Sequence, residues 1–233
     1  MTPQPPRTEP DAVAERYARR VDGDRYSASN PDVRMTLEER QRAILRLFAR
    51  RGWRDLSRLR LLEVGSGGGA NLLELLQLGF APEQLTGVEL LAARHAAARA
   101  ALPPAVTLFE GDATALDLPP ASQDIVLVST VLSSLLDDAF QQRLAERIWH
   151  WVRPGGGVLW YDFTVDNPRN PDVRGVPLRR IRELFPDASI EAERVTLAPP
   201  LARVVSRWHP ALYTLLNSLP MLRTHVLAWL AKT

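Results

Sequence analysis

Short apolar runs alternate with amphipathic stretches through the middle of the chain. Five runs have the length of buried strands: 59–65, 85–90, 106–112, 124–130 and 157–163. Three stretches between them place apolar side chains at helical spacing: 70–80, 91–102 and 137–152. Strands that alternate with helices in this way form a parallel sheet covered by helices on both faces. The pattern therefore predicts an α/β domain over residues 59–233.

The residues before this domain have a different pattern. Residues 1–10 are polar and rich in proline, so we expect a disordered tail there. A helical cap is expected over 11–58. Within it, Thr36 and Glu39 form a T-x-x-E capping box, which predicts a helix that begins at this point and ends near residue 52.

The residues after the fifth apolar run predict a mixed end to the sheet. A short helix is expected at 177–186, and residues 188–200 alternate with the period of a strand. A helical insert follows at about 199–222, with a kink at Pro210, and a final strand is expected at 224–232. Two late strands separated by a helical insert fit an antiparallel end to the sheet.

The composition is that of a globular chain without cysteine chemistry. Hydrophobic residues make up 45% and charged residues 24%, which is enough for a sizeable core. The absence of cysteine excludes disulfides, thiolate metal ligands and cysteine nucleophiles, and we expect no metal site. No signal peptide or membrane-spanning run is visible, so we expect a cytoplasmic protein. The net charge of only +2 argues against a nucleic-acid surface.

A glycine-rich turn is the strongest candidate for a ligand site. It has the sequence Glu63-Val-Gly-Ser-Gly-Gly-Gly69, follows an apolar strand and opens a helix, whose N-terminal N–H groups suit an anionic group. Glu89 ends the second strand, where a carboxylate can accept both hydroxyls of a ribose, and Asp112 ends the third, where it can accept from an adenine amine. The same turn also satisfies the G-x-G-x-x-G/A fingerprint of dinucleotide binders.

Taken together, these motifs resemble those of class I S-adenosylmethionine (SAM)-dependent methyltransferases of the type 11/25-like family. The runs LLEVGSGGGANLLELL, LTGVEL, EGDATALDLP, DIVLVSTVLSSLLD and WVRPGGGVLWYDF match successive motifs of that family. The resemblance implies a Rossmann-like three-layer sandwich, whose seven-stranded and mostly parallel sheet has an antiparallel last strand. It implies SAM as cofactor. It also implies these cofactor-binding residues: Glu63, Gly65, Ser66, Gly67, Glu89, Leu90, Asp112, Ala113 and Ser129.

Candidate residues for the reaction lie near the fifth strand and in the insert. Asp162 ends that strand and His209 lies in the insert, and either could act as a general base. The polar loop after the strand and a repeated NPDVR pentapeptide offer contacts for an anionic or sugar acceptor: Arg34, Asn167, Arg169, Asn170 and Arg174.

A resemblance of this region to methyltransferases of bacterial surface-polysaccharide pathways favours O-methylation of a small-molecule or glycan acceptor. An NAD(P)-dependent oxidoreductase and a non-catalytic SAM-binding protein are the alternatives. No nucleic-acid partner is expected, because the Asn/Asp-Pro-Pro-aromatic motif of amino-group DNA methyltransferases is missing after the fourth strand, where the chain reads Ser129-Thr-Val-Leu.

The insert has one further property. Its arginines, tryptophan and leucines suit a helix at a membrane surface, although a helix packed on the sheet is the favoured interpretation. The sequence does not indicate an oligomeric state.

Overall fold

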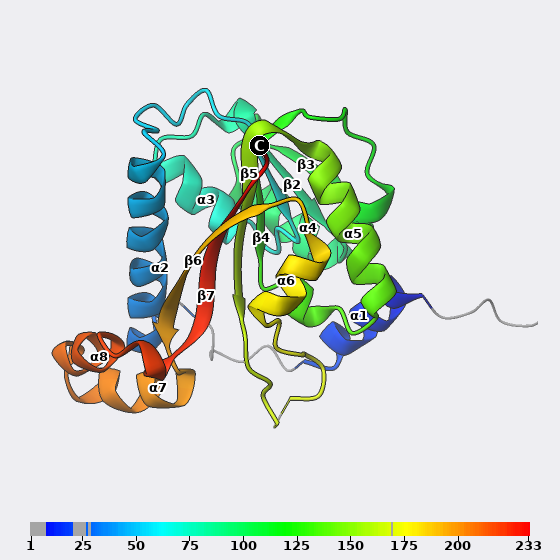
Figure 1. Ribbon diagram of the computed structural model, residues 1–233. Helices are drawn as coiled ribbons and strands as arrows, with labels where there is room; N and C mark the ends of the chain where they lie inside the picture. Colours follow the sequence, from blue (N-terminus) through cyan, green and yellow to red (C-terminus); the bar gives the residue numbers. More distant parts are fainter. Residues whose placement is uncertain (1–7, 21–26, 28, 169) are drawn as a thin grey trace, which may run out of the picture.

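The computed structural model describes residues 8–20, 27, 29–168 and 170–233. Its strands form one seven-stranded sheet in the order β3-β2-β1-β4-β5-β7-β6 (Figure 1). They are β1 (Leu61–Val64), β2 (Leu85–Glu89), β3 (Thr107–Glu110), β4 (Gln123–Ser129), β5 (Val152–Phe163), β6 (Ser189–Leu197) and β7 (Arg223–Ala231). Strands β1 to β5 pair in parallel, and β7 is antiparallel to both β5 and β6. The predicted fold class is confirmed.

Helices cover both faces of the sheet. One apolar core lies between the sheet and α2 (Pro31–Arg50), α3 (Ala70–Gln77) and α4 (Ala92–Ala101). A second core lies between the opposite face and α1 (Glu9–Ala18), α5 (Asp138–Trp151) and α6 (Leu178–Leu184). The two faces separate because successive strand residues point to opposite sides, so that Leu127 packs in the first core and Val128 in the second.

The remaining elements lie mainly at the ends of strands. Helices α7 (Pro199–Trp208) and α8 (Pro210–Asn217) connect β6 to β7. In the described residues, the short 3-10 turns are η2 (Pro82–Gln84), η3 (Ala113–Ala115), η4 (Leu132–Ser134) and η5 (Pro220–Leu222). Because β7 is antiparallel to both neighbours, β6 runs in the direction of β5, and α7 and α8 lie at the edge of the sheet where the parallel strands end (Figure 1).

Three local predictions differ from the structure. Helix α2 begins at Pro31, five residues before Thr36, so Thr36 and Glu39 lie inside the helix and form long-range contacts instead of a capping box. The Tyr213 hydroxyl donates to Glu39 and lies 3.3 Å from the Thr36 hydroxyl. Pro210 starts a new helix rather than kinking one, since His209 has an extended backbone. Helix α1 begins at Glu9, inside the segment that we expected to be a disordered tail.

Candidate functional site

The glycine turn after β1 is held tightly against the end of β2. Gly65 has φ +70°, and a Cβ atom there would lie 2.6 Å from Cγ2 of Val131. The backbone N–H groups of Gly65 and Ser66 both donate to the Val88 carbonyl, at 2.8 and 3.1 Å. Only glycine combines this left-handed conformation with so close an approach. The turn therefore leaves its backbone open toward the carboxyl edge of the sheet.

Glu89 links this turn to the one after β2. Its Oε2 accepts a hydrogen bond from Gly67 N at 2.7 Å, and its Oε1 accepts from Leu91 N at 2.9 Å. An ionised carboxylate has about four lone-pair sites, so two remain for a ligand. Glu89 is thus both a structural tie and a free acceptor at the rim of a cavity.

That cavity lies at the carboxyl ends of β1 to β4. Six of the predicted cofactor residues line it: Gly65, Glu89, Leu90, Asp112, Ala113 and Ser129. Asp112 also caps η3, because its carboxylate accepts from the backbone N and the hydroxyl of Thr114. Open α/β sheets bind ligands at this edge.

The other three predicted cofactor residues, Glu63, Ser66 and Gly67, are not among the residues that line the cavity. Glu63 is fully buried, and Asn71 donates to its Oε1 at 2.5 Å. Burial raises the pKa of Glu63 to about 7, although the hydrogen bond from Asn71 and the charge of Arg40 act in the opposite direction. Among the described residues, Oε2 of Glu63 and the hydroxyl of Ser66 have no hydrogen-bond partner. Gly67 reaches the site through its bond to Glu89.

Helix α1 supplies one wall of the cavity, which sequence reasoning missed. Pro10, Val13 and Tyr17 line it together with residues of the strand ends. The guanidinium carbons of Arg20 and Arg94 lie 3.9 and 4.4 Å from the centre of the Tyr17 ring. Val13 and Tyr17 are four residues apart, so the sequence predicts that they share one apolar face of a helix. It does not predict the surface on which that face packs.

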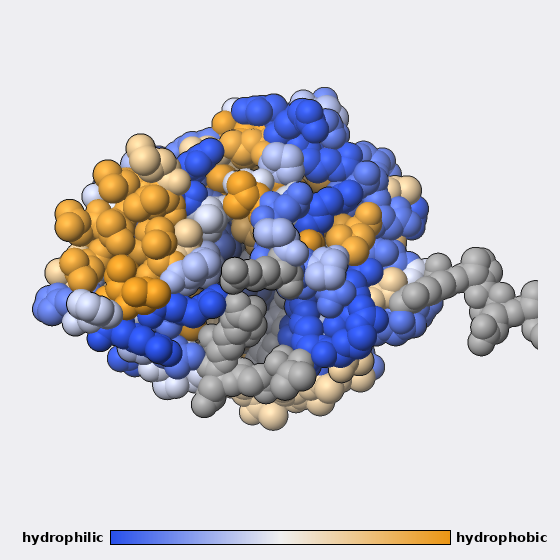
Figure 2. Space-filling model, turned by 90° about the horizontal axis from the view of Figure 1, so that it is seen from below, coloured by the Kyte–Doolittle hydropathy of each residue, from blue (hydrophilic) through white to orange (hydrophobic). Residues whose placement is uncertain are grey.

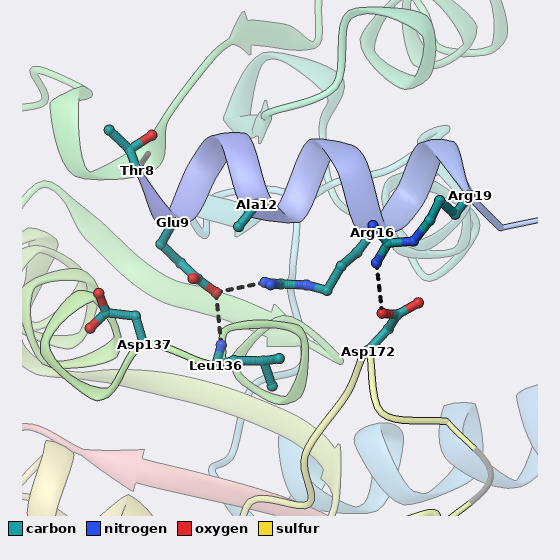
Figure 3. Close-up of a pocket in the computed structure, with 8 residues that line it drawn as sticks. All are labelled: Thr8, Glu9, Ala12, Arg16, Arg19, Leu136, Asp137 and Asp172. Carbon is teal, nitrogen blue, oxygen red and sulfur yellow. Dashed lines mark hydrogen bonds and ion pairs between the residues drawn. The ribbon is translucent and has the colours of Figure 1, made fainter. Parts of the chain in front are cut away.

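A set of polar contacts on the outer side fastens α1 in place (Figure 3). The Glu9 carboxylate accepts from Arg16 Nη2 at 2.6 Å and from Leu136 N at 2.7 Å, and Arg16 Nη2 also donates to the Ser134 carbonyl at 3.0 Å. Arg19 forms an exposed ion pair with Asp172 at 3.0 Å. These contacts tie α1 to the loops after β4 and β5, and we refer to the Glu9–Arg16 pair with its two backbone partners as the α1 latch.

The two candidate bases have different surroundings. Asp162 is fully buried at the end of β5, where its carboxylate accepts from Ser133 N at 3.1 Å and from Phe163 N at 2.9 Å. Burial raises the pKa of Asp162 to about 7, against the effect of these hydrogen bonds. His209 is exposed, and its Nδ1 accepts from Ala211 N at the start of α8. It is not among the residues that line the cavity.

The candidate acceptor residues are dispersed around the same edge. Arg174 pairs with Asp138 at the start of α5, and its backbone N donates to the Ser133 carbonyl. Arg34 is exposed in the first turns of α2, and Asn170 forms a local turn with Asn167. Arg169 lies outside the described residues. The two NPDVR copies therefore form a helix start and a loop, and none of the described acceptor candidates lines the cofactor cavity.

Comparison with known proteins agrees with the fold. Residues 61–156 match the family model of a methyltransferase domain. A SAM-dependent methyltransferase from Thermotoga maritima is similar over 95% of this chain and 100% of its own, with 14% identity and a TM-score of 0.64. Phosphoethanolamine N-methyltransferase 2 from Haemonchus contortus, in complex with S-adenosyl-L-methionine, is similar over 83% of this chain and 52% of its own, with 20% identity and a TM-score of 0.59. No curated protein matches the chain in sequence.

Residues 61–156 therefore match a methyltransferase domain, the fold is that of SAM-dependent methyltransferases, and these findings support SAM as the cofactor. The residues present fit this molecule. Glu89 retains acceptor capacity for ribose hydroxyls, and Gly65 lines the cavity without a side chain. The unpartnered carboxylate oxygen of Glu63 and the hydroxyl of Ser66 offer further polar atoms behind the turn.

Proposed function

We propose that this methyltransferase acts on a hydroxyl group of a small-molecule or glycan acceptor, with Asp162 as the general base. The bound cofactor supplies an electrophilic methyl group on a sulfonium. A hydroxyl acceptor must then be aligned with it and must lose its proton. The observation that carries the proposal is a buried carboxyl, with a pKa of about 7, at the end of β5.

Asp162 does not itself line the cavity, but it lies one contact away from it. Its carboxylate contacts Ser133, and the next residue of the η4 turn, Ser134, lines the cofactor cavity. A base with a pKa near the working pH is partly ionised and still a useful proton acceptor. Because Ser133 covers the carboxylate, the proposal includes a shift of η4 when the acceptor binds.

The acceptor would lie against the loops that follow β5 and precede α2. Arg34, Asn167, Arg169, Asn170 and Arg174 remain our candidates for contacts with it. Arg174 is held by Asp138 in an exposed pair, and a charged acceptor could compete for such a guanidinium. Neighbours in structure include an N-methyltransferase, so amines belong in the same acceptor screen.

Calorimetric titration is the first test of the cofactor assignment. We expect micromolar binding of SAM and S-adenosylhomocysteine and no binding of NAD. Binding of NAD alone would favour the oxidoreductase alternative. An acceptor screen that follows S-adenosylhomocysteine release should then show turnover with sugars or sugar nucleotides. Turnover with amines alone would contradict O-methylation, and SAM binding without any turnover would favour a non-catalytic role.

The substitution Asp162→Asn tests the base. In the wild type, we expect the rate to rise with pH through about 7, because Asp162 must lose its proton before it can accept another. The variant should lose this rise and about 100-fold or more in kcat, the usual contribution of a general base, while its Kd for SAM stays unchanged. Asp187→Asn, on an exposed turn, is the control. Equal kcat in a folded Asp162→Asn variant would remove Asp162 from the mechanism.

A further inference from the structure

Helices α7 and α8 and the turn η5 expose a continuous set of large apolar side chains. Trp208 is 81% exposed, Met221 80%, Leu215 63% and Val204 59%, and Leu201, Leu212 and Leu219 are also exposed. Figure 2 shows an apolar patch on this part of the molecule, seen from below. We call these seven residues the insert patch. Exposed apolar patches of this kind mark interaction surfaces.

The two helices carry apolar side chains on both sides, because Val205 and Leu216 pack inward while a second set faces solvent. The buried residues of α7 are the small Ala202 and Ser206, and those of α8 are Tyr213 and Asn217. Surface helices of globular proteins normally turn their largest apolar side chains toward the core. Here Val204 and Trp208, four residues apart on α7, face solvent instead. The sequence expectation that this insert simply packs on the sheet therefore explains only its inner face.

The charge of the segment has one sign. Residues 199–223 contain no aspartate or glutamate but carry Arg203, Arg207 and Arg223. A second copy docked through the same patch would place two sets of these arginines together, with no acid in the segment to pair with them. An anionic surface would satisfy the arginines and the apolar side chains together, because arginine can extend its guanidinium to lipid headgroups while its stem lies among apolar groups.

The lengths of the helices fit a position in the interface rather than a span. Helix α7 has 10 residues and α8 has 8, whereas about 20 apolar residues are needed to cross a bilayer. Within the described part of the chain, no helix is long and apolar enough to cross a membrane. Tryptophan and arginine on one short amphipathic unit are typical of helices that lie in the plane of the headgroups.

We propose that the insert patch docks this protein onto the surface of an anionic lipid bilayer. Trp208, Met221 and the neighbouring side chains enter the headgroup region, and Arg203 and Arg207 bind lipid phosphates. Because the α7–α8 unit lies at the carboxyl edge of the sheet, docking brings the edge that holds the cofactor cavity to the membrane (Figure 1). The proposal goes beyond the acceptor assignment, since lipid binding needs no acceptor.

Vesicle flotation with the full chain tests the surface. We expect the protein to float with phosphatidylcholine–phosphatidylglycerol vesicles and to stay behind with phosphatidylcholine alone. Each of Arg203→Gln and Arg207→Gln should weaken binding roughly fivefold, the effect of one cation near an anionic membrane. The triple variant Val204→Ser, Trp208→Ser, Met221→Ser should weaken it by at least about tenfold. Arg179→Gln and Leu45→Ser, exposed residues of α6 and α2, are the matched controls.

Tryptophan emission gives a second, local readout. All six tryptophans lie within the described residues, and Trp208 is the exposed one, so a blue shift on vesicles reports on the patch. The Trp208→Phe variant should float but lose the shift. All variants must keep the wild-type Kd for SAM, which shows that they fold. Absence of flotation, equal flotation with neutral lipid, or unchanged flotation of the triple variant would overturn the proposal. So would a concentration-dependent dimer in ultracentrifugation that the triple variant abolishes, because the occupant would then be a second copy.

Discussion

At the scale of single residues, Glu89 combines structure and ligand binding in one carboxylate. It accepts from two backbone N–H groups, those of Gly67 and Leu91, and so fixes the glycine turn relative to β2. It also lines the cavity, where we expect its remaining lone pairs to accept from the ribose hydroxyls of SAM. Removal of the carboxylate would therefore loosen the turn and delete an acceptor together.

The substitution Glu89→Ala should weaken SAM binding by about 1 to 3 kcal/mol, the usual cost when a partner of buried donors is lost. Calorimetry on the purified variant measures the change, and circular dichroism checks the fold. Glu110→Ala is a matched control. Glu110 lies on β3 directly beside Glu89 of β2, but it is partly exposed and contacts His95. An unchanged affinity for Glu89→Ala would show that the cofactor site has been assigned to the wrong residues.

Glu63 should make stability depend on pH. Its folded pKa of about 7 lies above the ordinary value of 4.5, so the unfolded chain loses this proton first as the pH rises. The contribution of protonated Glu63 to the free energy of unfolding is fully present below about pH 4.5. It is lost as the pH rises to about 7. The loss is on the order of 3 kcal/mol, from a shift of that size.

Urea unfolding of the cofactor-free protein at several pH values tests this. Glu63→Gln cannot ionise, so its stability should gain on the wild type across this pH range, whereas the exposed Glu110→Gln control should follow the wild type. If the free energy of unfolding changes with pH in the same way for Glu63→Gln and the wild type, Glu63 has its ordinary pKa in the folded protein.

At the scale of elements, α1 is a separate helix that completes the cofactor cavity from outside the sheet. Its apolar residues reach the cavity, while the α1 latch holds the helix against the loop after β4. Both side chains of the latch are about nine-tenths buried, whereas the Arg19–Asp172 pair is largely exposed. Buried pairs are strongly coupled to structure, and exposed ones contribute little.

Breaking the latch should therefore weaken cofactor binding without touching a cofactor contact. We expect Arg16→Met to raise the Kd for SAM roughly tenfold, because loss of one partner leaves the buried Glu9 charge uncompensated and α1 detaches. Arg19→Met should change the Kd by less than about twofold, since exposed pairs are worth little. Equal Kd values for the two variants would show that α1 does not need the latch to close the cavity.

At the scale of the whole molecule, the parts of the fold that depend on local pattern were predictable. The strand and helix alternation gave the sheet, and the glycine turn gave most of the cavity, because the carboxyl ends of parallel strands meet at one edge. The position of α1 was not predictable, since Arg16 and Tyr17 contact Ser134 more than a hundred positions away. The capping box at Thr36 failed for the same reason: Tyr213 and Thr196 bind its two residues in the folded chain.

The place of β7 has a consequence for how the chain leaves the ribosome. In the described part of the chain, β6 pairs with β7 alone, and β7 lies between β5 and β6. Until residues 223–231 have been synthesised, β6 has no neighbour and β5 presents an open edge, the kind of template on which nascent chains aggregate. The apolar insert emerges in that same interval. While β7 is missing, the open edge of β5 and the apolar insert should therefore be the parts of the nascent chain that chaperones bind.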